Sequence, residues 1–431
     1  MARDKGTREM PAHDRLYSSC KAGGRQGMCP ANALIDMPAG DPAGGMVAPF
    51  IPWSGANVLG MSRRPAAVAA LVETARRSGL GDGGDKAARA ALEATLAELH
   101  DAQAACTFAS RGDTRTATLA ALASLMPDLL ILSDEAWAAD TNAVFGFEMV
   151  TFQRDDPADL AALLRQGRPR RPVMVAFTAL NRVNGAVAPV KSICDLARGF
   201  GALTWLDESG ALGLYGPRGG GIAERDGARG MADIVEGSLA PALGVAGGYV
   251  AGDTAFCGAV QASASRLGII RLAAPMAAAA SCNAAHLRHS VAERIALALQ
   301  VERTRRALRT VRIPMAAGRS HIIMVPVAGA LQTRWAARLL LDQFGHRVET
   351  VDAPNGCEGL RIQPTPLHKT AAIEDLADAL DRVWDQLGLP RDDDASAPTW
   401  NVVPLQPGTD DDVAPIGYLA RRSARKRAAL G

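Results

Sequence analysis

Lysine is scarce in this chain, and positive charge is carried almost entirely by arginine. Among the 431 residues, 47 are lysine or arginine and 45 are acidic, which leaves a net charge of +2. The lysines stand at only six positions: Lys5, Lys21, Lys86, Lys191, Lys369 and Lys426. So even a balance of charge gives no reason to expect a nucleic acid or an anionic membrane as a partner.

The chain also lacks a long apolar run and any regular spacing of its cysteines. No stretch of roughly 18 apolar residues is free of proline, glycine or charge, so we expect no membrane-spanning helix. The first nine residues carry charges with no apolar core after them, unlike a signal peptide. The seven cysteines are scattered and form no Cys-x-x-Cys pair, which argues against a zinc site or a disulfide framework. We therefore expect a cytoplasmic protein with reduced thiols and no metal site.

Helical patterns alternate with short apolar runs between residues 46 and 300, which is typical of a large α/β domain. The apolar runs predict buried strands of a mostly parallel sheet at residues 129–132, 173–177, 203–206 and 248–251. Helices are predicted at residues 66–78, 87–100, 114–125, 160–165 and 191–200. With 48% hydrophobic residues, the chain can fill the core of this domain and of a second one.

A smaller α+β domain is predicted over residues 301–390, after a helical segment at residues 291–308. Its predicted strands are residues 322–326, 346–351 and 360–362, and its predicted helix is residues 373–387. Residues 1–45 are rich in glycine, proline and charge and predict a flexible arm. The tail, residues 391–431, has acidic blocks followed by a basic cluster, which indicates either a disordered tail or a segment that docks on a partner.

Two motifs at the centre of the chain carry a family resemblance. Residues 200–208 read Phe-Gly-Ala-Leu-Thr-Trp-Leu-Asp-Glu, and residues 215–221 read Tyr-Gly-Pro-Arg-Gly-Gly-Gly. Both closely resemble 5-aminolevulinate synthases of the α-oxoamine synthase family, and weaker similarity extends from about residue 53 to about residue 385. The resemblance implies the fold type I architecture of pyridoxal 5'-phosphate (PLP)-dependent transferases, with the active site at a dimer interface.

The residue that binds PLP in this family has no counterpart here. Residues 233–249 resemble the family's lysine loop, but Pro241 stands at the lysine position. A Schiff base needs a primary amine, so no catalytic residue is predicted. Asp207 matches the aspartate that bonds the pyridinium nitrogen, and its retention fits that role or inheritance without function. Ser238 is predicted as a vestigial phosphate ligand, and Arg361 as a vestigial clamp for a substrate carboxylate or as a buried ion-pair partner.

Other positions expected around the cofactor differ from the family in residue type. Ala138 replaces a ring-stacking histidine, and Gly210 replaces a second histidine. Thr178 begins the pair that replaces Glu-Ser near the ring hydroxyl. Arg271 lies where phosphate-binding Ser-Thr residues align, and would bring a new positive charge. The loop after residues 83–85 is shortened and lacks the family's arginine.

These differences come from separate segments that meet only around the cofactor, so we interpret the chain as a pseudoenzyme. We expect no cofactor, or PLP only if it binds noncovalently. The expected role is a non-catalytic subunit or regulator linked to tetrapyrrole biosynthesis, as a homodimer or a heterodimer with an active paralogue. The apolar run at residues 272–280 is typical of a surface buried in a dimer. Two alternatives stay open: a residual PLP-dependent acyltransferase of the 5-aminolevulinate synthase type, and a sensor of haem or acyl-CoA.

Two further features suggest ligands only weakly. Cys29 and Pro30 match a short haem-binding motif of some aminolevulinate synthases, although such a dipeptide also arises by chance at a turn. His286 and His289 stand three residues apart on a predicted helix, which fits a metal site less well than a solvated face.

Overall fold

The computed structural model of this chain describes residues 50–81, 86–141, 145–154, 156–166, 171–352 and 358–392. Contacts within the chain divide it into residues 1–37 and residues 38–431, and every described residue belongs to the second unit. The predicted arm and almost all of the predicted tail, together with Cys29, Pro30 and residues 83–85, therefore lie outside the described residues.

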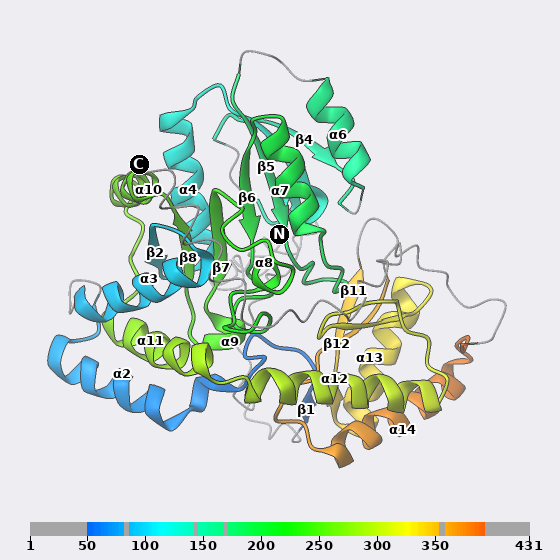
Figure 1. Ribbon diagram of the computed structural model, residues 1–431. Coiled ribbons are helices and arrows are strands. Elements are labelled where there is room, and N and C mark those ends of the chain that lie inside the picture. Colours follow the sequence, from blue (N-terminus) through cyan, green and yellow to red (C-terminus); the bar gives the residue numbers. More distant parts are fainter. Residues whose placement is uncertain are drawn as a thin grey trace, which may run out of the picture. The chain divides into compact units, whose positions relative to one another are not determined.

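A seven-stranded sheet forms the centre of the larger part of this unit (Figure 1). Its strands lie in the order β2-β8-β7-β6-β5-β3-β4. In chain order they are β2 (Ala104–Phe108), β3 (Leu130–Asp134), β4 (Glu148–Phe152), β5 (Val173–Thr178), β6 (Leu203–Asp207), β7 (Ile234–Ser238) and β8 (Gly248–Gly252). Strands β4 to β7 pair in parallel through β3, and only β8 runs antiparallel to its two neighbours. The predicted mostly parallel sheet is confirmed.

Helices cover both faces of this sheet, as is usual for parallel strands. Alternate residues of each strand point to opposite faces, so one strand contributes to the core on both sides. In β5, Val175 and Phe177 join a cluster with α6 (Pro157–Arg165) and α7 (Val190–Gly199). Met174 and Ala176 join another cluster with α4 (Arg111–Leu125) and α10 (Thr254–Arg266). The strand is therefore apolar from Val173 to Phe177, which is why the sequence predicts it from its apolar run.

A third cluster packs helices beside the antiparallel edge of the sheet. Its helices are α2 (Pro65–Ser78), α3 (Lys86–His100), α9 (Ala240–Leu243) and α11 (Ala274–His289), and a short 3-10 helix, η1 (Met61–Arg63), leads into α2. Two short helices, α5 (Glu135–Ala139) and α8 (Ile222–Arg225), follow β3 and β6. None of the helices in the described ranges is long and apolar enough to cross a membrane.

The remaining described elements build a smaller α+β layer. A three-stranded antiparallel sheet has the order β11-β12-β9, from β9 (Ile323–Pro326), β11 (Glu349–Asp352) and β12 (Glu358–Ile362). Around it pack α12 (Ala292–Thr310), α13 (Ala330–Phe344) and α14 (Thr370–Leu387). One strand had been predicted over residues 346–351, but it is split, because residues 346–347 (β10) leave this sheet and pair with β1 (Ile51–Pro52).

The beginning of the described chain packs with this smaller layer. Trp53 is fully buried in its cluster, and the indole nitrogen donates to Nδ1 of His346 at 3.1 Å. Because residues 51–53 join elements that follow residue 300, the two layers are interleaved along the chain. The predicted domain limits at residues 46, 300 and 390 stay predictions.

Candidate functional site

Buried carboxylates meet at the carboxyl end of the parallel strands. Asp207 is the last residue of β6, and in register it lies beside Glu236 of β7 and Thr178 of β5. Both carboxylates are fully buried. Side chains at the same register of neighbouring strands point to the same face, so the two negative charges are held side by side and need a positive partner.

Two arginines one turn apart on α4 supply that partner. Arg111 Nη1 donates to Oδ2 of Asp207 at 3.0 Å, and Arg115 Nη2 donates to the same oxygen at 2.9 Å. Arg115 Nη2 also contacts Oε1 of Glu236. The other oxygen of Asp207 accepts the backbone N–H of Ser209 at 2.7 Å. Both oxygens of the Asp207 carboxylate thus accept hydrogen bonds from donors of the chain itself.

The local sequence explains why both arginines face the sheet. Ser110 caps α4 by accepting the N–H of Asp113 at 3.0 Å, so Arg111 becomes the first helical residue. Residues four apart lie on one face of a helix, which places Arg115 above Arg111. The Arg115 guanidinium also lies 4.6 Å from the centre of the Trp137 ring.

The ion pairs extend outward from Arg111. Its Nη2 donates to Oδ2 of Asp140 at 2.7 Å, and Arg182 donates to the same oxygen at 2.8 Å. The stem of Arg182 lies against Gly210, where an added Cβ would stand 2.9 Å from the arginine Cγ. A side chain larger than hydrogen at position 210 would therefore displace Arg182.

Charge and burial act in opposite directions in this cluster. Burial alone would raise the pKa of Asp207, but the positive charges of Arg111 and Arg115 outweigh burial and hold that pKa below its ordinary value. Burial lowers the pKa of Arg115 to about 10, against the raising effect of Asp207. Both groups are therefore ionised at neutral pH.

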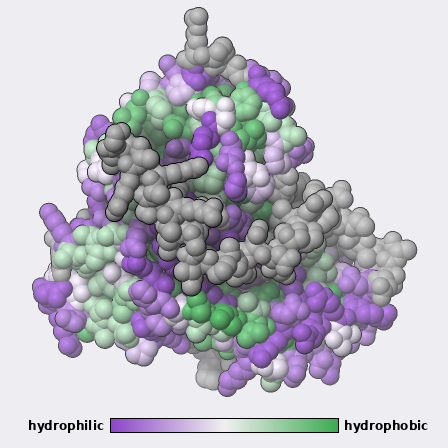
Figure 2. Space-filling view, in the orientation of Figure 1, coloured by the Kyte–Doolittle hydropathy of each residue, from purple (hydrophilic) through white to green (hydrophobic). Residues whose placement is uncertain are grey.

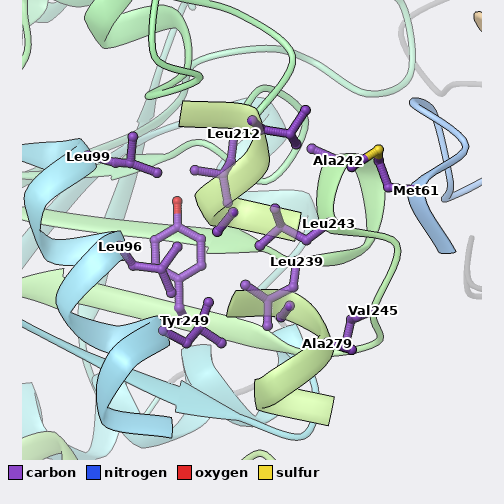
Figure 3. Packing of buried hydrophobic residues seen from close by; sticks show 14 of the residues in the cluster. Met61, Leu96, Leu99, Leu212, Leu239, Ala242, Leu243, Val245, Tyr249 and Ala279 are labelled. Atoms are coloured by element: carbon purple, nitrogen blue, oxygen red, sulfur yellow. The ribbon is translucent and has the colours of Figure 1, made fainter. Parts of the chain in front are cut away.

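Pro241 lies in the short helix α9, which follows β7. It is the second residue of that helix, where proline lacks only an N–H that would have no helical partner. Its carbonyl accepts the N–H of Leu59 at 3.2 Å. The neighbours Ala242 and Leu243 are buried with Leu212 and Tyr249 in an apolar cluster (Figure 3). The segment is thus held by packing and by a fixed backbone angle.

The other residues expected at a cofactor contact nearby parts of the chain. The Ser238 hydroxyl, at the end of β7, accepts the N–H of Ala240 at 3.3 Å. Ala138 is half-buried in α5, two residues before Asp140. Arg271 is paired with Glu93 of α3. The structure brings Asp207, Gly210 and Ala138 near one ion-pair cluster, whereas Arg271 is held by Glu93.

Arg361 is engaged in a cross-strand ion pair. Its guanidinium contacts the carboxylate of Glu349, which is its register partner on β11. It also donates to the backbone carbonyl of Arg182. Arg361 therefore links the three-stranded sheet to the loop that carries Arg182.

The lysines of the described ranges lie away from this cluster. Lys86 begins α3, Lys369 precedes α14, and Lys191 on α7 pairs with Asp195 at 2.8 Å. All three are exposed, whereas Asp207 is fully buried. Within the ranges that the structure describes, no lysine contacts Asp207.

The structure also bears on two observations about other surfaces. Nε2 of His286 lies 2.6 Å from the carboxylate oxygen Oε1 of Glu293, and no group of three or more metal-binding side chains occurs among the described residues. Residues 272–280, which had suggested a dimer surface, are largely buried within the chain itself, where α11 packs on α2 and α3. That run no longer supports the expected dimer.

Arg111, Arg115 and Glu236 were missed by sequence reasoning. The sequence predicts the helix α4 from residue 114, which leaves Arg111 outside it. A usable signal exists: Glu236 follows two β-branched residues in a buried strand, and a buried acid there requires a cation. Two arginines four residues apart are a natural source.

Comparisons with known proteins agree with this architecture. Residues 49–380 match the family model "Aminotransferase class I and II". A 5-aminolevulinate synthase of Bradyrhizobium diazoefficiens is 39% identical over 355 residues, covering 78% of this chain and 86% of that protein. The enzyme of the same name from Rhizobium meliloti is 37% identical, with 79% and 87% covered.

Solved structures share the fold at lower identity. A serine palmitoyltransferase of Sphingomonas wittichii superposes with a TM-score of 0.71 at 21% identity, covering 79% of this chain and 89% of that one. An 8-amino-7-oxononanoate synthase of Francisella tularensis gives a TM-score of 0.65 at 15% identity, with 78% and 98% covered. The chain therefore belongs to the aminotransferase class I and II family, has the fold type I architecture of PLP-dependent enzymes, and is a relative of the 5-aminolevulinate synthases.

Proposed function

We propose that this chain is a catalytically inactive relative of 5-aminolevulinate synthase that acts as a non-catalytic subunit or regulator linked to tetrapyrrole formation. In this proposal Pro241 stands at the position of the PLP-binding lysine, and the chain works without PLP. Its partner is an active paralogue or a second copy of itself.

The observation that carries the proposal is that none of the lysines in the described ranges lies next to Asp207. PLP chemistry of this family requires a lysine amine next to the cofactor. The three lysines in the described ranges are all exposed, and one of them is paired with Asp195. Pro241 has no amine and is fixed in α9.

The remaining groups of the site also fit PLP poorly. Asp207, the expected partner of the pyridinium nitrogen, already accepts from two guanidinium groups and from the N–H of Ser209. Arg361, the expected partner of a substrate carboxylate, pairs with Glu349. A cofactor or substrate would have to displace an ion pair at each place, which costs free energy.

The link to tetrapyrrole formation rests on ancestry. Relatives named 5-aminolevulinate synthase are 37–39% identical to this chain over 355 residues. A fold of this size that has lost its chemistry keeps its surfaces for contact, so a protein partner is the natural object of its function.

The test of inactivity combines spectroscopy and turnover. We expect the purified protein to develop no Schiff-base absorbance with PLP and to form no 5-aminolevulinate from glycine and succinyl-CoA. A bacterial 5-aminolevulinate synthase serves as the positive control. Borohydride-stable PLP on the protein, or turnover above background, would support the alternative of a residual acyltransferase instead.

The test of partnership uses two lengths of the chain. The intact protein and a version that ends at Pro390 are used as baits in extracts of the native cell. We expect both to capture a 5-aminolevulinate synthase or another tetrapyrrole enzyme if the folded part makes the contact. Capture by the intact protein alone would assign the contact to the tail, and capture of neither would remove the pathway from the proposal.

A further inference from the structure

We propose that Arg111 and Arg115 are a permanent internal substitute for the positive charge of a cofactor ring at Asp207. This inference deepens the proposed function and rests on it, because it takes Asp207 as the residue that a pyridinium would contact. It assigns to two arginines of α4 a role in excluding such a ring.

The first support is the demand for charge. Asp207 and Glu236 are both fully buried and lie side by side in register. Two buried carboxylates repel each other and lose their hydration, so they stay ionised only beside a cation. In a PLP enzyme of this fold the ring nitrogen is such a cation. Here Arg115, with 5% of its side chain exposed, contacts both carboxylates.

The second support is the position of Arg111. Arg111 and Arg115 both donate to Oδ2 of Asp207, and Nη1 of Arg111 lies 3.0 Å from that oxygen. The side chain of Arg111 is 17% exposed, so it lies on the outer side of the pair, where a ligand would approach. Its second nitrogen is fixed by Asp140, which in turn binds Arg182.

The third support is that Arg111 belongs to a continuous network of ion pairs and hydrogen bonds. The stem of Arg182 packs on Gly210, and its backbone carbonyl accepts a hydrogen bond from Arg361. The network therefore runs without a break from Glu236 on β7 to Glu349 on β11. Its members in order are Glu236, Arg115, Asp207, Arg111, Asp140, Arg182, Arg361 and Glu349. Four acids and four arginines form this network, and a cationic ring would have to compete with an arginine that already contacts Asp207.

The experiment measures reversible binding of pyridoxamine 5'-phosphate, which has no aldehyde and so cannot react with surface amines. We compare the natural protein with Arg111→Ala, with Arg111→Ala/Asp207→Asn, and with Arg171→Ala. Arg171 forms a surface ion pair with Glu148 and controls for the loss of one positive charge. Calorimetry or ring fluorescence gives the dissociation constant of each.

We expect Arg111→Ala to bind the ligand about tenfold more tightly or better than the natural protein. The Asp207→Asn change should abolish that gain, and Arg171→Ala should behave like the natural protein. Equal affinity of the natural protein and Arg111→Ala would overturn the inference while leaving the proposed inactivity intact. Schiff-base formation by the natural protein with PLP would instead overturn the proposed function.

A second measurement does not depend on a ligand. The melting temperatures of Arg111→Gln, Asp207→Asn and the double variant form a mutant cycle. If Arg111 serves as counter-ion to Asp207, the melting temperature of the double variant should fall by less than the sum of the decreases in the two single variants. Strictly additive losses would show that the two residues do not act on each other, and the inference would fall.

Discussion

Two carboxylates stand side by side inside the large sheet, and Arg115 contacts both of them. Because Asp207 and Glu236 are fully buried, neither can turn to water when its partner is removed. A buried pair adds little net stability when intact, yet removal of one member leaves an uncompensated charge. Replacing one side chain of this cluster should therefore lower the free energy of unfolding more than the number of its contacts suggests.

At this scale we predict that Arg115→Met lowers the free energy of unfolding by about 3–5 kcal/mol. Methionine keeps much of the stem but removes the guanidinium that contacts both carboxylates. Glu236 then keeps only a 3.8 Å contact with Arg111, and Asp207 keeps one arginine where it had two. The loss should shrink at lower pH, because Asp207, whose pKa the arginines hold below its ordinary value, then takes up a proton and no longer carries charge. Urea unfolding followed by circular dichroism at two pH values measures both effects.

Arg171→Met is the matched control, since its ion pair with Glu148 lies at the surface. That change should cost about 0–1 kcal/mol. If Arg115→Met were as mild as Arg171→Met, the cluster would not be a centre of structural charge.

A second prediction at this scale concerns acid stability. Burial, aided by Arg229, lowers the pKa of His100 to about 3, and burial, aided by Arg361, does the same for His321. Below pH 6.5 the unfolded chain takes up these protons whereas the folded chain does not. Stability is therefore lost as the pH falls from 6.5 towards 3, by about 1.4 kcal/mol per pH unit for each histidine.

Comparison of the natural protein with His100→Gln isolates one of these contributions. Between pH 4 and pH 6 the free energy of unfolding should fall less steeply with falling pH in the variant. The slope should be smaller by about 1.4 kcal/mol per pH unit, which corresponds to one proton. Glu208, whose pKa burial raises to about 7, acts in the opposite direction in both proteins and so cancels. His289→Gln, at an exposed site, is the matched control. An unaltered slope in His100→Gln would contradict the prediction.

At the scale of elements, continuous apolar runs were the most reliable guide. Strands β5 and β6 are buried on both faces, and their predicted limits differ from the observed ones by one residue. Strand β7 was missed because Glu236, Gly237 and Ser238 interrupt its apolar character. Charge inside a strand is interpretable only when its partner is known, and Arg115 lies 121 residues away in the sequence.

The family resemblance drew attention to Asp207 and Arg361, and their assignment as site residues stays a prediction. In the structure the two residues belong to one network of ion pairs that a hydrogen bond between Arg361 and the Arg182 carbonyl completes. The resemblance gave no reason to look at Arg111, because the first turn of α4 lay outside the predicted helix. Local pattern can indicate that a buried acid needs a cation, but long-range contacts decide which arginine supplies it.

The helix α9 allows a prediction at this scale. Pro241→Lys supplies the missing amine but leaves Arg111 and Arg115 on Asp207, so we expect neither Schiff-base absorbance nor turnover. We also expect the variant to lose roughly 1 kcal/mol of stability, because lysine frees the unfolded backbone that proline restricts. Absorbance spectra with PLP and urea unfolding provide the two measurements.

Pro241→Ala is the control for that loss, since it removes the ring without adding an amine. The two variants should be similarly stable. Substantial 5-aminolevulinate formation by Pro241→Lys would mean that the ion pairs around Asp207 yield readily to the cofactor.

At the scale of the whole chain, the surface carries an apolar stripe with no partner among the described residues. Val291, Ile295 and Leu299 follow one another at intervals of four, just before and along the first part of α12, with exposed fractions of 47%, 54% and 52%. Hydrophobic residues gather in the lower part of the face shown in Figure 2, where Figure 1 places the beginning of α12. Exposed apolar residues in a row are typical of protein contacts.

We therefore predict that the protein forms a stable dimer and that this stripe contributes to it. Obligate interfaces often bury more than roughly 2,000 Å², so one charge at the centre should weaken association strongly without unfolding the chain. Ile295→Glu should move the protein towards monomer in sedimentation velocity at micromolar concentration. Leu331→Glu, at a 61% exposed position on α13, adds the same charge elsewhere and should leave the dimer intact. A natural protein that sediments as a stable monomer would contradict the dimer itself, whereas equal association of Ile295→Glu and Leu331→Glu would move the contact to another face.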